Sequence, residues 1–450
     1  MAISAPAASK VTTTTGEQGK QNYSTALYSL MVLFFVLGFI TCLNDILIPY
    51  LKVIFKLNYT QVNLINLCFF SAYFFISIPG GKLVQKYGYK TIMIVGFVVA
   101  AIGSLLFYPA ASYKMYGLFL GALFILATGI TLLQVAGNPY VAVLGSPETS
   151  SARLTLTQAL NSLGTTIAPL VGTFFILSNL PKMPPELQGL SSYADLQGHL
   201  STLLNNILDK TELIYLQGTY LVIATILLTI GLVLFMMKLP AIGHGDNDDA
   251  ISTEGIAEKS SIWQYRHLVL GMVGIFAYVG AEVSIGSHII NYLGMKSVMG
   301  YTTIEAGHFV AYYWGGAMLG RFVGTLILAK FNPGKVLGTY ALLAITLILI
   351  SISAHGELAM WALLLVGFCN SLMFPTIFTL AIKGLGKYTD QASGLLCTAI
   401  VGGAILPLLF GTVADLTEGN LKIALLIPLA SYIYISFFGF SGHKPVKAPR

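Results

Sequence analysis

Asp45 is an acidic residue that follows a long uncharged stretch of the chain, residues 26–43. A stretch of this kind is long enough to begin a membrane-spanning helix. An ionised aspartate near the bilayer centre costs at least about 2.5–3.5 kcal/mol on insertion scales, so it must face a polar cavity, find partners or hold a proton. The alternative places Asp45 at the helix end, among the lipid headgroups. Apolar sequence continues past it to Ile48, which favours the acid of a buried transport site.

Amide and hydroxyl side chains recur inside other apolar stretches at helical spacing. Gln134 and Asn138 are four residues apart, and Gln158, Asn161 and Thr165 follow one another at intervals of three and four. Residues at these spacings share one face of a helix. Such groups can hydrogen-bond the hydroxyls of a sugar while bringing little charge into the membrane. The alternative is that they bond one another across helices.

Further candidates for sugar contacts combine polar and aromatic side chains. Aromatic rings can stack on the apolar face of a sugar, but with 12% aromatic residues most rings are expected in the core or at the membrane interface. We expect one or two contacts among Tyr73, Tyr278, Tyr312, Tyr313 and Trp314. The candidate sugar-binding residues are Asn44, Asn138, Gln158, Glu282, His288, Asn291, Asn370, Tyr312 and Trp314.

Composition identifies the environment in which these residues act. Only 9% of the 450 residues are charged, 56% are hydrophobic and the mean hydropathy is +0.78. Soluble domains carry about 25% charged residues, so this chain is predicted to be a polytopic membrane protein. The basic residues are spread over short loops, which argues against a nucleic-acid partner. The four cysteines lie in apolar segments without metal-ligand spacing and are expected to be free thiols.

Uncharged apolar runs predict an all-α membrane protein with twelve transmembrane helices in two bundles of six. We expect a disordered cytoplasmic tail over 1–24, an N-terminal bundle over 25–238, a cytoplasmic linker over 239–265, a C-terminal bundle over 266–441 and a tail over 442–450. The spans are predicted at 26–52, 61–82, 91–112, 115–144, 153–179, 213–237, 267–293, 304–329, 336–353, 358–382, 391–414 and 421–441.

Lysine and arginine predict the orientation of these spans. With both termini in the cytoplasm, most of the 24 lysine and arginine residues, Arg321 among them, lie on the inner face. This asymmetry follows the positive-inside rule, and it puts the 180–212 loop outside. The basic residues left outside are Lys52, Lys56, Lys114, Lys182, Lys210, Lys296 and Lys422.

The two halves resemble each other at a nearly constant offset. Gly38 matches Gly280 at 242 residues, Pro139 matches Pro375 at 236, and Gly164 matches Gly402 at 238. Parallel six-helix repeats with a substrate site between them are the layout of the major facilitator fold. By the same correspondence, Asn370 takes the place of Gln134 in the second half.

Several motifs resemble those of the fucose permease family of the major facilitator superfamily, and the resemblance is closest to its glucose/galactose branch. It implies a bacterial inner-membrane hexose symporter, with Asp45 and Asn161 as partners at the coupling site. The partners implied are a small sugar, a coupling cation and the lipid bilayer, for a chain expected to be a monomer without a bound cofactor. The motifs are Leu43–Pro49, Leu133–Tyr140, Gln158–Thr166, Tyr278–Ser287 and Asn370–Thr376.

One departure bears on the coupling ion. Fucose permeases proper carry a glutamate where this chain has Gln134, which leaves Asp45 as the carboxylate of the first-half cavity. Gln134 cannot titrate, although its carbonyl oxygen can ligate a hard cation. A sodium site built from Asp45, Asn161 and Thr165 is therefore slightly favoured over proton coupling. L-fucose or N-acetylglucosamine symport with protons stays open as an alternative.

Two other classes of function compete with transport. An enzyme would need a nucleophile–base pair or a metal cluster within a span, but Glu282 and His288 are six residues apart and lie on different helical faces. A sugar-sensing receptor on a transporter scaffold would normally carry a long signalling domain, which neither the linker nor the tails provide. We therefore expect no enzyme activity.

If Asp45 works by carrying charge, Asp45→Asn should abolish cation-driven sugar accumulation, because the isosteric amide keeps shape and hydrogen bonding but cannot ionise. Sugar exchange without a gradient can persist in this variant. Uptake into vesicles under an imposed cation gradient measures the difference. Full accumulation by Asp45→Asn would exclude a coupling role for this carboxylate.

Overall fold

The structure is a computed structural model that describes residues 24–55, 59–175, 201–203, 206, 214–237, 239 and 260–444. All regular elements in these ranges are helices. The predicted N-terminal tail, the 180–212 loop as a whole and most of the predicted linker lie outside the described residues. The first half contains α1 (Ser24–Ile54), α2 (Tyr59–Tyr87), α3 (Tyr89–Ser112), α4 (Tyr116–Val143), α5 (Ser150–Phe175) and α7 (Ile214–Met236).

The second half repeats this order with more interruptions. Its last three predicted spans are each built from two or more consecutive helical pieces. The elements are α9 (Arg266–Gly294), α10 (Thr303–Leu328), α11 (Pro333–Ser353), α12 (Gly356–Asn370), α13 (Met373–Ala381), α14 (Thr389–Thr398), α15 (Gly402–Leu416), α16 (Leu421–Ala424) and α17 (Leu426–Phe437).

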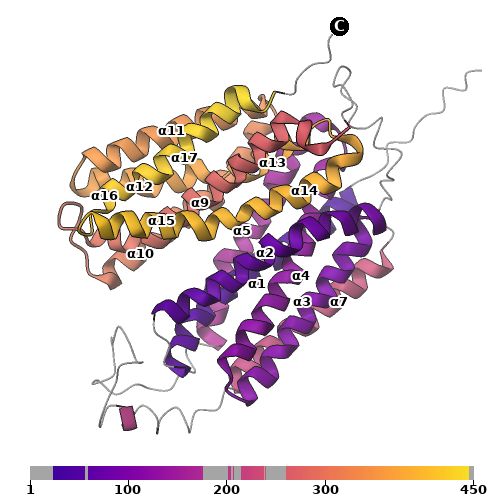
Figure 1. Cartoon of the computed structure of the whole chain (residues 1–450), viewed down its shortest axis with the longest axis horizontal. Helices are drawn as coiled ribbons and strands as arrows, with labels where there is room; N and C mark the ends of the chain where they lie inside the picture. The colour runs from indigo at the N-terminus through magenta and orange to yellow at the C-terminus, as the bar shows by residue number, and fades with distance from the viewer. Residues whose placement is uncertain are drawn as a thin grey trace, which may run out of the picture.

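The predicted fold class is confirmed. Within the described ranges, nine helical segments are long and apolar enough to cross a membrane. The long helices α1, α5 and α10 fall on the three remaining predicted spans, which completes the set of twelve. In Figure 1 the helices of the two halves form two separate bundles that lie against each other.

Matching glycines build matching contacts in the two halves. A Cβ atom on Gly164 of α5 would lie 2.1 Å from the backbone oxygen of Phe35 in α1. In the second half, a Cβ atom on Gly402 would lie 2.2 Å from the backbone oxygen of Phe276 in α9. Only a residue without a side chain permits this close approach. The repeat predicted from sequence offsets is therefore present in the packing of the first and fifth spans of each half.

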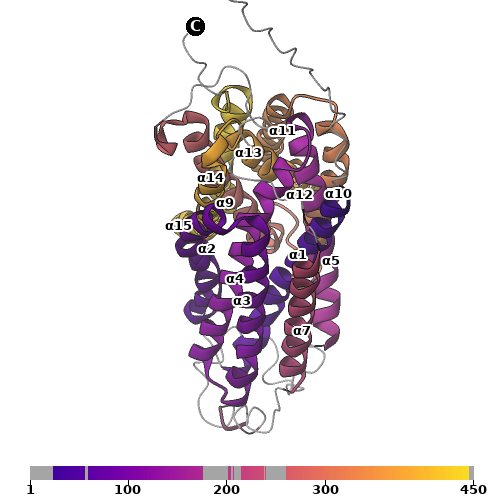
Figure 2. The ribbon, with the colours of Figure 1, turned by 90° about the vertical axis from the view of Figure 1, so that its right-hand side faces the viewer.

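The two halves are bonded to each other at one end of the molecule, which we call the closed end. There Gln391 Nε2 donates to Gln85 Oε1 at 2.7 Å, and the Tyr89 hydroxyl donates to the Asp390 carboxylate. The hydroxyls of Ser151 and Thr379 share a hydrogen bond at 2.6 Å. Figure 1 shows the two bundles together near α14 and diverging toward the opposite end, and Figure 2 gives the view along the side of the bundles. The sequence predicts that the closed end faces the cytoplasm.

Two glycines let α2 and α14 touch backbone to backbone across this boundary. A Cβ atom on Gly394 would lie 2.5 Å from the backbone oxygen of Ser77, and one on Gly81 would lie 2.8 Å from that of Asp390. Real Cβ atoms do not approach backbone oxygens this closely, so any larger residue must push the two helices apart. Contact between the halves therefore depends on the absence of side chains at both positions.

Gly394→Ala should shift the molecule toward states in which the closed end is open, because the added methyl overlaps a backbone oxygen of the other half. Overpacking of this kind costs about 1–3 kcal/mol. Spin labels on cysteines that replace the exposed residues Lys86 and Lys387 report the distance between the two halves. We expect a new, longer distance component in Gly394→Ala.

The matched control is Gly411→Ala, because a Cβ atom on Gly411 of α15 meets no atom within 4 Å. Its distance distribution should equal that of the parent protein. An unchanged distribution in Gly394→Ala would show that the glycine contact does not determine closure.

Candidate functional site

Two prolines at matching positions of the repeat release backbone carbonyl groups at the boundary between the halves. Proline has no N–H, so the carbonyl four residues before it loses its helical partner. Pro139 in α4 releases the Val135 oxygen, which accepts a hydrogen bond of 2.8 Å from the Ser393 hydroxyl of α14. Pro375 in α13 releases the Ser371 oxygen, which accepts from Arg321 Nε at 3.1 Å. Both freed carbonyls are thus used by polar side chains from another helix.

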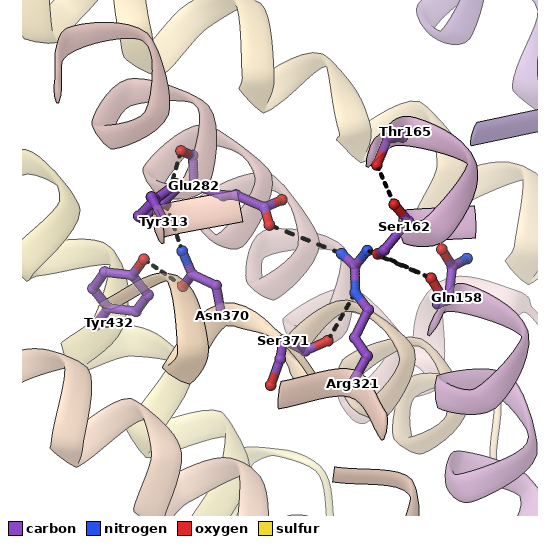
Figure 3. A network of polar contacts seen from close by, with 9 residues as sticks. All are labelled: Gln158, Ser162, Thr165, Glu282, Tyr313, Arg321, Asn370, Ser371 and Tyr432. Atoms are coloured by element: carbon purple, nitrogen blue, oxygen red, sulfur yellow. Dashed lines mark hydrogen bonds and ion pairs between the residues drawn. The ribbon is translucent and has the colours of Figure 1, made fainter. Parts of the chain in front are cut away.

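Arg321 is the centre of a polar network that joins the halves (Figure 3). Its side chain comes from α10 and is held in the second half by the Ser371 oxygen and by Glu282 of α9, whose Oε1 lies 4.0 Å from Nη2. On the opposite side, Nη1 donates to the Ser162 hydroxyl and, at 3.5 Å, to the Gln158 backbone oxygen. Both residues belong to α5 in the first half.

Several buried polar atoms next to this guanidinium are left without hydrogen bonds. The Ser371 hydroxyl is buried and has no hydrogen-bond partner, and Glu282 Oε1 has the ion pair with Arg321 but no hydrogen bond. A buried charge costs several kcal/mol unless it is paired and hydrogen-bonded. The Arg321–Glu282 pair meets the first condition at 4.0 Å but not the second. The region can therefore accept additional polar partners.

Asn370 organises the neighbouring part of the second half. Its amide nitrogen donates to the Tyr313 hydroxyl at 2.8 Å, and its oxygen accepts from the Tyr432 hydroxyl at 2.5 Å. The Tyr313 hydroxyl in turn donates to the Glu282 backbone oxygen at 3.1 Å. Asn370 is fully buried. This candidate sugar-binding residue is thus occupied by protein partners that fix α9, α10 and α12 relative to one another.

The first half holds the equivalent amide–tyrosine contact. Gln134 Nε2 donates to the Tyr73 hydroxyl of α2 at 2.9 Å. Nearby, Gln158 Nε2 donates to Asn138 Oδ1 at 3.3 Å, while the buried Asn138 Nδ2 has no partner. The structure therefore brings three predicted site residues, Asn138, Gln158 and Gln134, onto facing helices. It leaves one amide N–H group among them free to donate.

Asn161 and Thr165 lie where α5 packs against α1. Asn161 Nδ2 donates to the Phe34 backbone oxygen at 3.0 Å, so its carbonyl oxygen is not used in that bond. Thr165 donates its hydroxyl hydrogen to the Ser162 backbone oxygen at 2.8 Å and keeps its lone pairs. Both side chains thus present an oxygen acceptor, which is what a sodium ligand requires.

The side chains of Asn44 and Asp45 lie outside the described residues. The α1 backbone is helical through both positions. Asp45 follows Gly38 by seven residues in the sequence. Gly38 packs against Asn161, since a Cβ atom there would lie 2.0 Å from the Asn161 backbone oxygen. The predicted partnership of Asp45 with Asn161 stays a prediction.

The other second-half candidates are distributed over two surfaces. His288 is half-buried, with Nδ1 2.8 Å from the Ser284 backbone oxygen and its ring against Phe410 at 4.6 Å, whereas Asn291 is exposed. Trp314 packs against the Gly286 position of α9 and is 42% exposed. The network of Arg321 includes none of these residues, and their sugar contacts stay predictions.

Tyr313, and not the candidate sugar-binding residue Tyr312, is the second-half equivalent of Tyr73. Tyr312 is 57% exposed and packs against Trp361 at 5.5 Å, away from the network. Its neighbour Tyr313 is fully buried and makes the contact with Asn370 that Tyr73 makes with Gln134. A shift of one residue turns a side chain by about 100° around a helix, so an offset that is wrong by one selects a different face of the helix.

Arg321 is the residue of this site that the sequence interpretation misplaced. It was counted among the inner-face basic residues, although it lies inside the predicted span 304–329. The structure places it within α10, seven residues before the helix ends, where it is part-buried. A charged residue inside a span is a functional candidate by default, and Glu282 needed a counter-charge. Together, these two features of the sequence could have predicted that Arg321 and Glu282 form a pair.

Comparison with known proteins identifies the family. The Major Facilitator Superfamily model matches residues 30–408. A glucose/galactose transporter of Brucella abortus is 48% identical over 444 residues, covering 99% of this chain and 100% of the relative. The L-fucose-proton symporter of Escherichia coli is 37% identical over 91% of each chain. The chain belongs to the fucose permease family of the major facilitator superfamily.

A solved structure of the same family matches this fold. The crystal structure of the Escherichia coli fucose:proton symporter in the outward conformation has a TM-score of 0.79 at 34% identity, over 93% of this chain and 98% of that chain. In this fucose permease family member, bonds between the halves at the closed end accompany the divergence of the bundles toward the other end.

Asn370→Leu should destabilise this family member, because it leaves the buried hydroxyls of Tyr313 and Tyr432 without their shared partner. Each buried polar group that loses its partner costs about 1–3 kcal/mol. The thermal unfolding midpoint in detergent should fall clearly in Asn370→Leu. The control, Asn291→Leu, alters an exposed amide on α9 and should unfold near the parent midpoint. Equal midpoints for the two variants would contradict a structural role for Asn370.

Proposed function

We propose that this chain is a secondary active transporter that imports a hexose of the glucose, galactose or mannose type by symport with a cation. Sodium is slightly favoured over a proton, and transport proceeds by alternating access. The observation that carries the proposal is the full-length 48% identity to a relative named as a glucose/galactose transporter. The chemistry of the site agrees with it, as follows.

The polar groups between the halves suit an uncharged polyol. Sugar hydroxyls both donate and accept, and the amides of Gln134, Asn138 and Gln158 offer both kinds of group. Asn138 Nδ2 and Glu282 Oε1 are buried without a hydrogen bond, so a sugar hydroxyl that bonds either atom gains a favourable contact on binding. A ligand that satisfies these buried atoms removes a desolvation cost that the sugar-free protein bears.

The coupling cation would use oxygens of the first half. Asn161 and Thr165 each keep an oxygen acceptor, and Asp45 supplies the negative charge in the proposed set. Gln134 has no charge to hold a second proton. One cation that moves inward through about 100 mV releases roughly 2.3 kcal/mol, enough for about a fiftyfold sugar gradient.

The proposal also covers the cellular location of the chain and its orientation in the membrane. The chain would lie in the bacterial inner membrane as a monomer, with both termini and the closed end in the cytoplasm. The basic residues Lys86 and Lys387 are exposed near the closed end, in keeping with the positive-inside rule. The state described here would then be open to the periplasm.

Proton-coupled L-fucose transport is the second candidate, supported by the similarity to the Escherichia coli symporter. N-acetylglucosamine symport and a sugar-sensing receptor remain as further alternatives. The first two differ from the main proposal in sugar and ion, and the receptor differs in moving no sugar at all.

Uptake by the purified protein in proteoliposomes tests these alternatives, with labelled glucose, galactose, mannose, L-fucose and N-acetylglucosamine offered separately. An inward sodium gradient and an inward proton gradient are each imposed alone. We expect glucose or galactose to accumulate with sodium, and the accumulation to collapse when a sodium ionophore is added. Accumulation of L-fucose with protons alone would support the second candidate. Binding without uptake of any sugar would support the receptor.

A further inference from the structure

The contact between Arg321 and α5 lies deep in the molecule. Ser162 is twelve residues into α5, about 18 Å along the helix from its first residue. The Ser151–Thr379 bond, by contrast, lies at the beginning of that helix. Arg321 therefore joins the halves far inside the closed end, level with the residues proposed to contact the sugar.

The guanidinium is held from three directions. The second half fixes Nε through the Ser371 oxygen and Nη2 through the Glu282 carboxylate, and Nη1 is the group that reaches the first half at Ser162 and Gln158. A planar fork with donors on three sides can make these contacts at once, whereas a lysine ammonium cannot. The side chain is thus anchored in one half and bonded to the other.

Two of its partners are also proposed sugar contacts. Gln158 accepts from Arg321 through its backbone and faces Asn138 through its side chain, and Glu282 pairs with Arg321 at 4.0 Å. Glu282 Oε1 is buried and has the ion pair with Arg321 but no hydrogen bond. A polyol that bonds the Glu282 carboxylate would compete for the same group that holds Nη2 of Arg321 in place.

We propose that Arg321 is a positioning residue that links the sugar site to the closed end. With the sugar site empty, its bond to α5 helps to hold the halves together at the closed end. A sugar that engages the Glu282 carboxylate draws the guanidinium away from Ser162 and thereby favours opening. This proposal rests on the proposed sugar transport, but its first test requires no sugar.

The test measures the accessibility of a buried position at the closed end. Ser151 is 4% exposed, and Ser151→Cys is introduced in a protein whose four native cysteines are replaced by alanine. Its rate of reaction with N-ethylmaleimide in detergent reports opening. Arg321→Gln should raise this rate about fivefold or more, because it removes a charge-assisted hydrogen bond between the halves. Arg321→Lys should give a smaller increase, since the charge remains while the fork is lost.

Two further variants keep the result interpretable. Ser162→Ala removes the first-half partner without touching a charge, and should raise the rate in the same direction even if Arg321→Gln does not fold. Lys330→Gln removes an exposed positive charge just after α10 and should leave the rate unchanged. Unchanged labelling in folded Arg321→Gln and Ser162→Ala would overturn the proposal.

A second arm separates this proposal from the proposed function. Glucose or galactose with sodium should raise labelling in the parent protein and have little further effect in Arg321→Gln. A full sugar response that survives in Arg321→Gln would overturn the link between the site and the closed end. If no sugar changes the labelling rate of the parent protein but Arg321→Gln still raises it, the role of Arg321 in holding the halves together is supported and the proposed hexose function is wrong.

Discussion

A guanidinium inside a membrane protein must be neutralised and hydrogen-bonded where it lies, and much of the second-half architecture serves that requirement. Glu282 supplies the charge, and Pro375 supplies a carbonyl that the helix itself no longer uses. Asn370 then fixes Tyr313, which binds the Glu282 backbone. Glu282, the helix break before Pro375 and Asn370 thus belong to one arrangement around Arg321.

The contact surface between the halves is composed so that it can separate again. The carbonyl released by Pro139 accepts a single hydrogen bond from the Ser393 hydroxyl of the other half, and Gln85 and Gln391 pair through neutral amides. A neutral hydrogen bond contributes only about 0.5–1.5 kcal/mol net, because water takes its place when it breaks. A set of such bonds stabilises the state in which the halves are in contact, but it can still be broken at low cost. Small differential binding energies can then shift the population of states.

Much of the architecture was readable from the sequence, because apolar runs and repeated glycines leave strong one-dimensional signals. The offsets that paired Gly164 with Gly402 predicted a real packing motif. The site was harder to read, since its residues are selected by rotation around a helix. Tyr312 and Tyr313 are neighbours in the sequence, but Tyr312 is exposed and Tyr313 is buried. Arg321 was misplaced because a basic residue near a span end fits the positive-inside rule equally well.

Gln85 at the closed end and Gln134 in the candidate site both make contacts through neutral amides. At the closed end, Gln85 meets Gln391 through neutral amides, so that this contact does not depend on charge. In the site, Gln134 binds Tyr73 without a proton to gain or lose. The charged contacts between and within the halves are thereby concentrated on Asp390 with Tyr89 and on Glu282 with Arg321. The energy of a buried charge depends more strongly on its partners than the energy of a buried amide does. Under our proposal, sugar binding therefore acts most strongly on the contact between Arg321 and α5.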